Sequence, residues 1–299
     1  MSDPVTTTTA TTTANGACLL SGKPVAAALN AETQARVAVF VGLYGYAPIL
    51  AAVSVGVTPD GARYMETLRR SAMGVGLAFE RRDLPVETTA EALATHLREL
   101  NAAVQVAGIL VAMPLPAHIP ASVVEETLDA RKDVDGITPA SVGRLTLGLP
   151  AFAPATPAGG IALLRHYGVA LAGRRAVVVG RSAVVGKPFA QLLLHANATV
   201  TIAHSHTPDL AAVTREAELL AVAAGRPGLI TPEMVRPGAT VIDFGTNYTA
   251  DGLRGDVAPA VAAVAAAMTP VPGGTGPVTN AVILRNMMVA AEREAANHE

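Results

Sequence analysis

The chain has 299 residues, of which 51% are hydrophobic but only 3% aromatic, and its formal net charge is −2. This length allows two domains with separate cores, and the near-zero charge gives no electrostatic basis for nucleic-acid binding. The single cysteine, Cys18, excludes an internal disulfide, and no apolar run approaches the ~20 residues of a membrane span.

The first sixteen residues contain a block of threonines and lack the basic-then-apolar layout of a signal peptide. We interpret residues 1–16 as a disordered tail on a cytoplasmic protein. Beyond them, short β-branched-rich runs alternate with amphipathic stretches. A strand and helix are predicted within 19–41, further strands over 49–56, 77–81 and 106–111, and helices over 59–74, 88–100 and 121–128.

This alternation of strands and helices predicts an α/β fold with a mostly parallel sheet. The Gly- and Pro-rich stretch Gly143–Pro157 reads as a linker between two domains. We therefore predict a first domain over 17–150, completed by a final helix over 278–296, and a second domain over 151–277. The second domain is expected to hold a helix over 159–166 and strands over 176–179, 199–203, 219–223 and 240–244.

The strand Ala176–Val179 is followed by a turn at Gly180 and by a helix that begins near Gly186. Free backbone N–H groups and the positive end of a helix dipole at such a turn favour a bound phosphate. The turn lacks the G-x-G-x-x-G fingerprint of generic dinucleotide sites, so the phosphate site needs support from other residues.

The end of the next strand indicates which dinucleotide the second domain binds. NAD-binding folds of this type place an acidic residue about 20 positions after the glycines, to hold the ribose 2′-OH. Here that strand ends in His204, Ser205 and His206, with no acid. Arg181, in the glycine turn, together with Ser205 suits a 2′-phosphate. These residues favour NADP over NAD, with a solvated loop charge as the alternative for Arg181.

Six motifs together resemble the methylenetetrahydrofolate dehydrogenase/cyclohydrolase family, and they occur in that family's order across roughly residues 19–296. The resemblance implies a two-domain protein, usually a homodimer, with a C-terminal Rossmann-type NADP-binding domain and a folate substrate in the cleft between the domains. From the net charge and the lack of a long apolar run we expect neither a nucleic-acid nor a membrane partner, and we expect no metal. The motifs are Gly108-Ile-Leu-Val-Ala-Met-Pro-Leu-Pro116, Lys132-Asp-Val-Asp-Gly136, Val142-Gly-Arg-Leu145, Gly180-Arg-Ser…Val185-Gly-Lys-Pro188, Val241-Ile-Asp-Phe-Gly245 and Thr269-Pro-Val-Pro-Gly-Gly-Thr-Gly-Pro277.

The resemblance also assigns roles to single positions. Asp135 matches the aspartate that hydrogen-bonds the pterin ring, and Tyr64 matches the tyrosine that stacks on the folate. A turn aspartate and a core aromatic are the alternatives. The loop Gly273–Thr279 matches the segment that closes over the substrate, unless it is a turn without a ligand. The expected substrate contacts are Tyr64, Asp135, Pro272, Gly273, Gly276, Pro277 and Thr279, and the expected cofactor contacts are Gly180, Arg181, Ser182, Val185, Gly186 and Ser205.

The chain departs from the bifunctional members of that family at two positions. Those members carry a catalytic lysine four residues after the tyrosine, where this chain has Leu68, and a glutamine that bonds the lysine, where it has Ala112. Hydride transfer needs two rings held in position, whereas hydrolysis of the methenyl cation needs an acid or base. The neighbours Arg69 and Arg70 project in other directions from the helix and do not release a proton near neutral pH.

Three functions are consistent with this pattern. The leading one is an NADP-dependent methylenetetrahydrofolate dehydrogenase with little or no cyclohydrolase activity. A second is an enzyme that passes the one-carbon unit to another acceptor in a biosynthetic pathway. A third is a folate- or nucleotide-binding regulator without catalysis.

Overall fold

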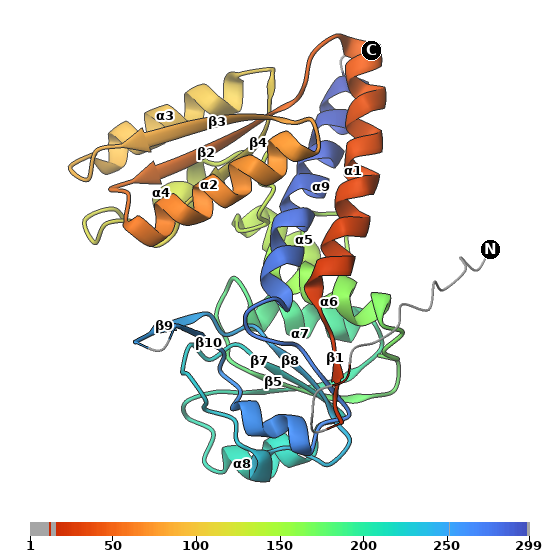
Figure 1. Cartoon of the computed structure of the whole chain (residues 1–299). Coiled ribbons are helices and arrows are strands. Elements are labelled where there is room, and N and C mark those ends of the chain that lie inside the picture. Colours follow the sequence, from red (N-terminus) through yellow and green to blue (C-terminus); the bar gives the residue numbers. More distant parts are fainter. Residues whose placement is uncertain (1–11, 13–15, 251, 298–299) are drawn as a thin grey trace. The chain divides into compact units, whose positions relative to one another are not determined.

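The computed structural model describes residues 12, 16–250 and 252–297, which form two compact units (Figure 1). We describe each unit separately. The three-stranded unit contains residues 27–155 and those from Asn280 onward, and the six-stranded unit contains those up to Ala26 together with 156–279. The predicted tail over 1–16 lies outside the described residues apart from Thr12 and Gly16.

The three-stranded unit is built on a parallel sheet in the order β3-β2-β4, with β2 (Ile49–Val55) in the centre, β3 (Ala78–Leu84) on one side and β4 (Val106–Val111) on the other. Both faces of β2 and β4 are buried, because their sequences are near-continuous runs of small aliphatic residues.

Two helices with threonine caps flank this sheet. α2 (Pro59–Gly74) begins where the Thr58 side chain accepts a hydrogen bond from the N–H of Gly61, and α3 (Ala90–Ala102) begins in the same way at Thr89. The apolar face of α3 packs on one face of the sheet, and Figure 1 shows α2 on the other. The carboxyl ends of β2 and β4 therefore form a defined edge of this unit.

The segment after β4 is more helical than the sequence indicated. The predicted helix over 121–128 is α4 (Ser122–Thr127). The predicted linker Gly143–Pro157 is wrong at both ends, since α5 (Pro139–Thr146) covers its start and α6 (Ala155–His166) covers its end. Thr138 caps α5 and Pro139 occupies its first turn, where the missing N–H costs nothing.

The six-stranded unit has an all-parallel sheet in the order β1-β11-β8-β7-β5-β6. The chain runs from β5 outward to β6 and then back to β7 on the other side of β5. Parallel sheets bind ligands at such a switch point, beyond the carboxyl ends of the strands. The strands are β1 (Cys18–Leu19), β5 (Arg175–Val179), β6 (Thr199–Ala203), β7 (Leu219–Val222), β8 (Thr240–Asp243) and β11 (Ala267–Met268).

The helices and a hairpin complete this unit. α7 follows β5 and α8 follows β6, while the antiparallel hairpin of β9 and β10 comes after β8. The sequence did not predict the hairpin, β11 or the two 3₁₀ segments, because all of them are short. The bounds are α7 (Gly186–His195), α8 (Leu210–Arg215), β9 (Asn247–Thr249), β10 (Gly252–Arg254), η1 (Pro232–Met234) and η2 (Pro259–Ala263).

Two long helices contribute to both units along the chain. α1 (Gly22–Tyr44) passes from the six-stranded unit into the three-stranded unit after Ala26, and α9 (Thr275–Ala296) does so after Thr279. The sequence placed residues 17–26 with the first domain, but β1 pairs with β11, so these residues belong to the six-stranded unit. The other predicted boundaries, 150/151 and 277/278, stay predictions.

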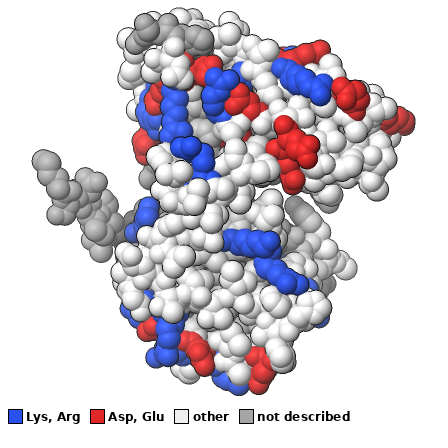
Figure 2. Space-filling view, turned by 180° about the vertical axis from the view of Figure 1, so that it is seen from behind, with Lys and Arg blue, Asp and Glu red and all other residues white. Residues whose placement is uncertain are grey.

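The parallel sheets confirm the predicted α/β class. Of the helices that the structure describes, none combines the length and the apolar character required to cross a membrane. Acidic and basic side chains are interspersed on the face shown in Figure 2, consistent with the small net charge.

Candidate functional site

The turn Asp133–Gly136 is built around the buried carboxylate of Asp133. The backbone N–H groups of Ile137 and Thr138 donate to it, as do the hydroxyls of Thr138 and Ser141, at distances between 2.7 and 3.0 Å. Gly136 has φ of +68°, and a Cβ there would lie 2.6 Å from the backbone of residues 152 and 153. The turn is therefore fixed in shape, and it presents Asp135 in one orientation.

Asp135 has few partners of its own. The backbone N–H of Ala155 donates to its carboxyl group, and it makes no other hydrogen bond to a described residue. Burial, reinforced by the charge of Asp133, raises the pKa of Asp135 to about 7, against the opposing effect of the Ala155 N–H. A half-buried carboxyl group with unused acceptor capacity is a candidate ligand-binding group.

Tyr64 lies close to Asp135. Burial, and then the negative field of Asp135, raise the pKa of the Tyr64 phenol, which therefore stays protonated at neutral pH. The residue is nevertheless 38% exposed, so part of its surface is accessible to a ligand. Of the predicted site residues, these two are brought together within the three-stranded unit.

Leu68 lies one helical turn after Tyr64 on α2 and is completely buried. Ala112 directly follows β4, and its N–H donates to the carbonyl of Val53 at 2.8 Å. Neither side chain carries a proton-transfer group. Arg69 is bound to Glu66 through two hydrogen bonds of 2.8 Å, which holds its guanidinium on the surface of α2.

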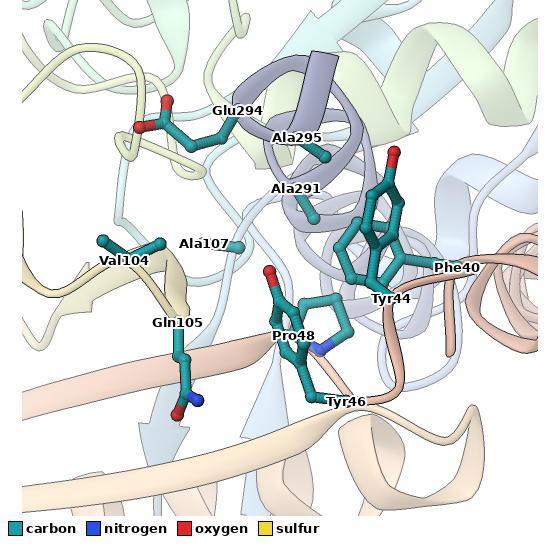
Figure 3. Close-up of a pocket in the computed structure, with 10 residues that line it drawn as sticks. All are labelled: Phe40, Tyr44, Tyr46, Pro48, Val104, Gln105, Ala107, Ala291, Glu294 and Ala295. Atoms are coloured by element: carbon teal, nitrogen blue, oxygen red, sulfur yellow. The ribbon is translucent and has the colours of Figure 1, made fainter. Parts of the chain in front are cut away.

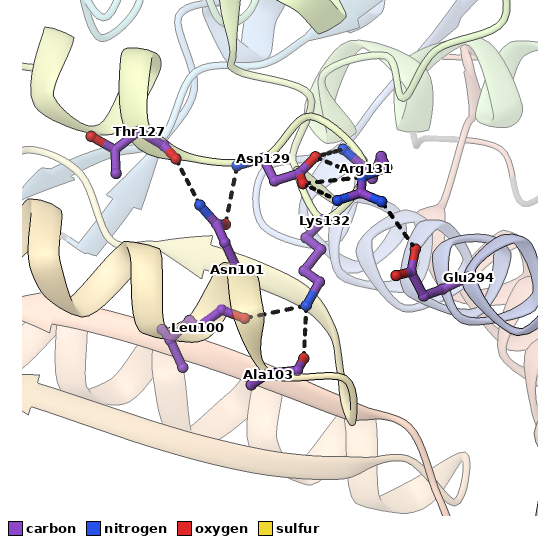
Figure 4. A network of polar contacts seen from close by, with 8 residues as sticks. All are labelled: Leu100, Asn101, Ala103, Thr127, Asp129, Arg131, Lys132 and Glu294. Carbon is purple, nitrogen blue, oxygen red and sulfur yellow. Dashed lines mark hydrogen bonds and ion pairs between the residues drawn. The ribbon is translucent and has the colours of Figure 1, made fainter. Parts of the chain in front are cut away.

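The motif residue before Asp133 has a structural role. Lys132 is 4% exposed, and its Nζ donates to the carbonyl oxygens of Leu100 and Ala103 at the end of α3 (Figure 4). Burial lowers the pKa of Lys132. A cation at a helix C-terminus satisfies carbonyl groups that the helix leaves unpaired. Lys132 therefore anchors the turn that carries Asp135.

The glycine turn after β5 fits a phosphate-binding role. Gly180 has φ of +125°, and a Cβ there would lie 2.2 Å from the carbonyl oxygen of Ala223. A Cβ on Gly186 would lie 2.3 Å from the carbonyl oxygen of Gly180. Both glycines are required by these close approaches. The Ser182 hydroxyl accepts from the N–H groups of Val185 and Gly186, at 3.1 and 3.3 Å.

A cavity of about 360 Å³ lies at the switch point of the six-stranded sheet. Its walls come from the loops that follow β5, β6 and β7. Apolar and polar groups both line it, as is usual for nucleotide pockets. The lining residues are Val179, Gly180, Arg181, Ser182, His204, Ser205, Thr207, Leu210, Ala223, Ala224, Arg226 and Leu229.

The predicted cofactor contacts are thus largely on one cavity. Gly180, Arg181, Ser182 and Ser205 line it, whereas Val185 and Gly186 are not on its wall and lie at the start of α7. The exposed side chains of Arg181 and Ser205 come from different loops and share the cavity. This arrangement suits recognition of a phosphate on the ribose.

The other predicted substrate contacts belong to the six-stranded unit. Pro272 and Gly276 are exposed, while Gly273, Pro277 and Thr279 are half-buried. Gly273 has φ of +101°, and its carbonyl accepts from the N–H of Gly22 at 2.8 Å. α9 begins at Thr275, three residues earlier than predicted, so Gly276, Pro277 and Thr279 are helical.

A larger cavity of about 430 Å³ lies elsewhere in the three-stranded unit, lined by the aromatic rings of Phe40, Tyr44 and Tyr46 (Figure 3). Pro48 and Gln105 on its wall directly precede β2 and β4. It is therefore at the amino ends of these strands, opposite the edge where parallel sheets bind ligands. It contains none of the predicted site residues.

Comparison with known families agrees with this division of the chain. Residues 20–135 match the catalytic domain of tetrahydrofolate dehydrogenase/cyclohydrolase, and residues 154–295 match the NAD(P)-binding domain of the same family. The chain belongs to the tetrahydrofolate dehydrogenase/cyclohydrolase family.

Individual members of the tetrahydrofolate dehydrogenase/cyclohydrolase family are similar over nearly the whole length. A protein of Chloroflexus aurantiacus named bifunctional protein FolD is 51% identical over 91% of this chain and 96% of its own length. The crystal structure of the bifunctional FolD of Campylobacter jejuni is 38% identical, with a TM-score of 0.89, over 92% of this chain and 98% of its own. The Trypanosoma brucei enzyme, solved with NADP and an inhibitor, is 35% identical with a TM-score of 0.88, over 93% and 98% respectively.

Membership of the tetrahydrofolate dehydrogenase/cyclohydrolase family confirms the predicted resemblance, the two-domain α/β fold and the pairing of a folate substrate with a nicotinamide dinucleotide. The roles assigned to single residues stay predictions.

Several residues that build these sites were not singled out by the sequence. Asp133 and Lys132 shape the turn that carries Asp135, and Asp256 and Arg226 shape the cavity that follows β5, β6 and β7. Asp133 and Lys132 lie inside a family motif, so the motif itself was the available signal. Asp256 and Arg226 lie outside the motifs, and their roles follow only from the tertiary contacts.

Proposed function

We propose that this chain oxidises 5,10-methylenetetrahydrofolate to 5,10-methenyltetrahydrofolate with NADP, and that its cyclohydrolase activity is weak or absent. The observation that carries the second part is the complete burial of Leu68, one turn after Tyr64 on α2. The resemblance puts the catalytic lysine of bifunctional members at this position. The names of the relatives above include both the dehydrogenase and the cyclohydrolase, or call the protein bifunctional, and the proposal for this chain departs from those names at the hydrolytic step.

Binding of the folate is assigned to Asp135 and Tyr64. The carboxylate of Asp135 has acceptor capacity for the N–H groups of a 2-amino-4-oxo pterin ring. The neighbouring Tyr64 is partly exposed, and its aromatic ring can stack on the folate. Together they orient the folate, and the loop over 272–279 is proposed to enclose it.

Binding of the cofactor is assigned to the cavity after β5, β6 and β7. Arg181 and Ser205 hold the 2′-phosphate, and the glycine turn admits the pyrophosphate because Gly180 and Gly186 have no side chain. NADP, when bound, accepts a hydride from the methylene carbon of the folate. The chain contributes orientation and exclusion of water, which is sufficient for hydride transfer.

Hydrolysis of the methenyl product makes a different demand, because a proton has to move between oxygen and nitrogen as water attacks. A general acid or base contributes typically ~10²–10⁴-fold to such a step. Leu68 and Ala112 supply neither, and Arg69 is held by Glu66. The product is therefore expected to be released as the methenyl form.

A direct assay tests the proposal. Purified protein is mixed with methylenetetrahydrofolate and NADP, and NADPH and methenyl absorbance are followed separately. We expect equal amounts of the two products, with the methenyl form lost only at its spontaneous rate. NADPH formation without accumulation of the methenyl form contradicts the loss of hydrolysis.

A double variant tests the role of the two apolar positions. Leu68→Lys with Ala112→Gln is expected to raise hydrolysis, by ~10²-fold if the lysine acts as a general acid or base. Leu68→Met with Ala112→Gln is the matched control, because it keeps the buried volume and adds no titratable group. Since Leu68 is buried, thermal unfolding is measured for both. A folded double variant without increased hydrolysis contradicts the assignment.

Transfer of the one-carbon unit to another acceptor, and binding without catalysis, remain the alternatives. Binding of both ligands without NADPH formation indicates one of them. The homodimer implied by the resemblance and the cytoplasmic location predicted from the N-terminal sequence also stay predictions, which sedimentation analysis and cell fractionation test.

A further inference from the structure

Arg226 lies on the wall of the nucleotide cavity but has no role in the function proposed above. It follows β7, whereas Arg181 follows β5. Its side chain is exposed, and its guanidinium makes no hydrogen bond or ion pair to another described residue. A cation without a partner on the wall of a ligand cavity is available to an anionic ligand.

The backbone that carries Arg226 is held in a fixed shape by one buried carboxylate. The consecutive N–H groups of Ala224, Gly225 and Arg226 donate to Asp256, at 2.6, 2.9 and 2.8 Å. Asp256 has no exposed surface, and the side-chain amide of Asn247 donates to it as well. The hydrogen bonds to Asp256 therefore hold the backbone of the exposed loop, and the Arg226 side chain takes no part in them.

The loops of Arg226 and Arg181 are in direct contact. A Cβ on Gly180 would lie 2.2 Å from the carbonyl oxygen of Ala223, so the residue before Arg181 touches the first residue after β7. Both arginines thus arise from adjoining backbone and open onto one cavity of about 360 Å³. A cavity of this size holds about one nucleoside-sized group.

The surrounding charges favour an anion. No aspartate or glutamate is among the described residues that line the cavity. His204 and Ser205 line it from the loop after β6. The N–H of His206 donates to Nδ1 of His204 at 3.1 Å. Nδ1 acts as an acceptor there, which leaves the proton on Nε2 as a donor.

We propose that Arg226 is a second arginine for the 2′-phosphate of NADP, acting together with Arg181, and that it sets the preference for NADP over NAD. This inference rests on the proposed cofactor. Two guanidinium groups from separate loops meet a phosphate dianion better than one, because each donates charge-assisted hydrogen bonds to different oxygens. NAD has no group at that position, so its binding does not use Arg226.

Equilibrium binding of NADP and NAD to the full chain tests the inference, without folate. Arg226→Gln is expected to weaken NADP binding about tenfold and leave NAD binding unchanged. Arg226→Lys keeps the charge but loses the two-pronged geometry, and should fall between. The same affinities are measured for 2′,5′-ADP and 5′-AMP, which differ only in the 2′-phosphate and lack the nicotinamide half of the cofactor.

The control is Arg215→Gln, which removes an exposed positive charge from α8 in the same unit, away from the cavity wall. It should leave both affinities unchanged. Equal weakening of NADP and NAD by Arg226→Gln overturns the inference, as does no change in either. If the wild-type protein binds no NADP, the proposed cofactor is wrong, and this outcome does not depend on the variant.

Discussion

Two aspartates of the six-stranded unit and two of the three-stranded unit differ in how many hydrogen bonds their carboxylates accept. In the six-stranded unit, Asp256 accepts four hydrogen bonds, and Asp243 accepts from the N–H groups of Gly245, Asp256 and Val257. In the three-stranded unit, Asp133 accepts four, while Asp135 has the single N–H of Ala155.

Burial raises the pKa of Asp135 to about 7 and that of Asp243 to about 6, so the pKa alone does not separate the two. The donors do. Asp243 is enclosed by backbone groups that it holds together, and it fixes the loops around it. Asp135 is presented by a turn that Asp133 has already fixed, and its oxygens are left for a ligand. Burial and a shifted pKa therefore do not by themselves mark a candidate ligand-binding aspartate, and unused hydrogen-bond capacity is the feature that separates Asp135 from Asp243.

The largest effect expected from this comparison is on stability. Asp256→Ala leaves three backbone N–H groups and the Asn247 amide without their acceptor, and should lower the free energy of unfolding by about 3 kcal/mol. Asp135→Ala removes a carboxyl group with one donor and should change it by less than about 1 kcal/mol. Urea unfolding followed by circular dichroism measures both. Equal losses contradict the division between the two aspartates.

The next largest effect is on catalysis, where a substitution of Asp135 matters although it hardly changes stability. Asp135→Asn keeps the size of the side chain and replaces one acceptor oxygen with a donor, which opposes the N–H groups of a pterin ring. It should lower kcat/KM for methylenetetrahydrofolate by about 10²-fold, since hydrogen bonds to a charged group are worth more than neutral ones. The dissociation constant of NADP should not change. An unaffected kcat/KM shows that Asp135 does not contact the folate.

The sequence predicted the α/β class and the order of the main strands because parallel strands such as β4 are continuous aliphatic runs between clear turns. Helix α5 was missed because Gly143 and Gly148 make its surroundings look like a linker, although Thr138 and Pro139 are standard start signals. The partner of β1 was also missed, since pairing with β11, nearly 250 residues later, is a tertiary event.

The candidate site was predictable only where a motif carried it. Asp135 and Tyr64 were singled out by resemblance, and their proximity required the structure. No local pattern distinguishes the satisfied Asp133 from the unsatisfied Asp135, two residues apart in one motif, because the donors come from the α5 cap and from α6. Arg226 was missed for a similar reason, since it reaches the cavity through a loop held by Asp256.

The smallest expected effect is the pH dependence of folate binding, and it tests the charge state of Asp135. With a pKa of about 7, roughly a tenth of the free protein has Asp135 ionised at pH 6 and roughly nine tenths at pH 8. If the carboxylate accepts the pterin N–H groups, the affinity measured without cofactor should rise about ninefold over this range. Tyr64 stays protonated because its pKa is raised, so it adds no titration of its own.

Asp135→Asn provides the matched control, because any titration of the ligand persists in the variant while that of residue 135 is lost. The sign is opposite for folding, because a raised pKa stabilises the folded state at low pH and this contribution is lost as pH rises through the folded-state value of about 7. If the folate affinity of wild type and variant changes with pH in the same way, folate binding does not depend on the charge of Asp135.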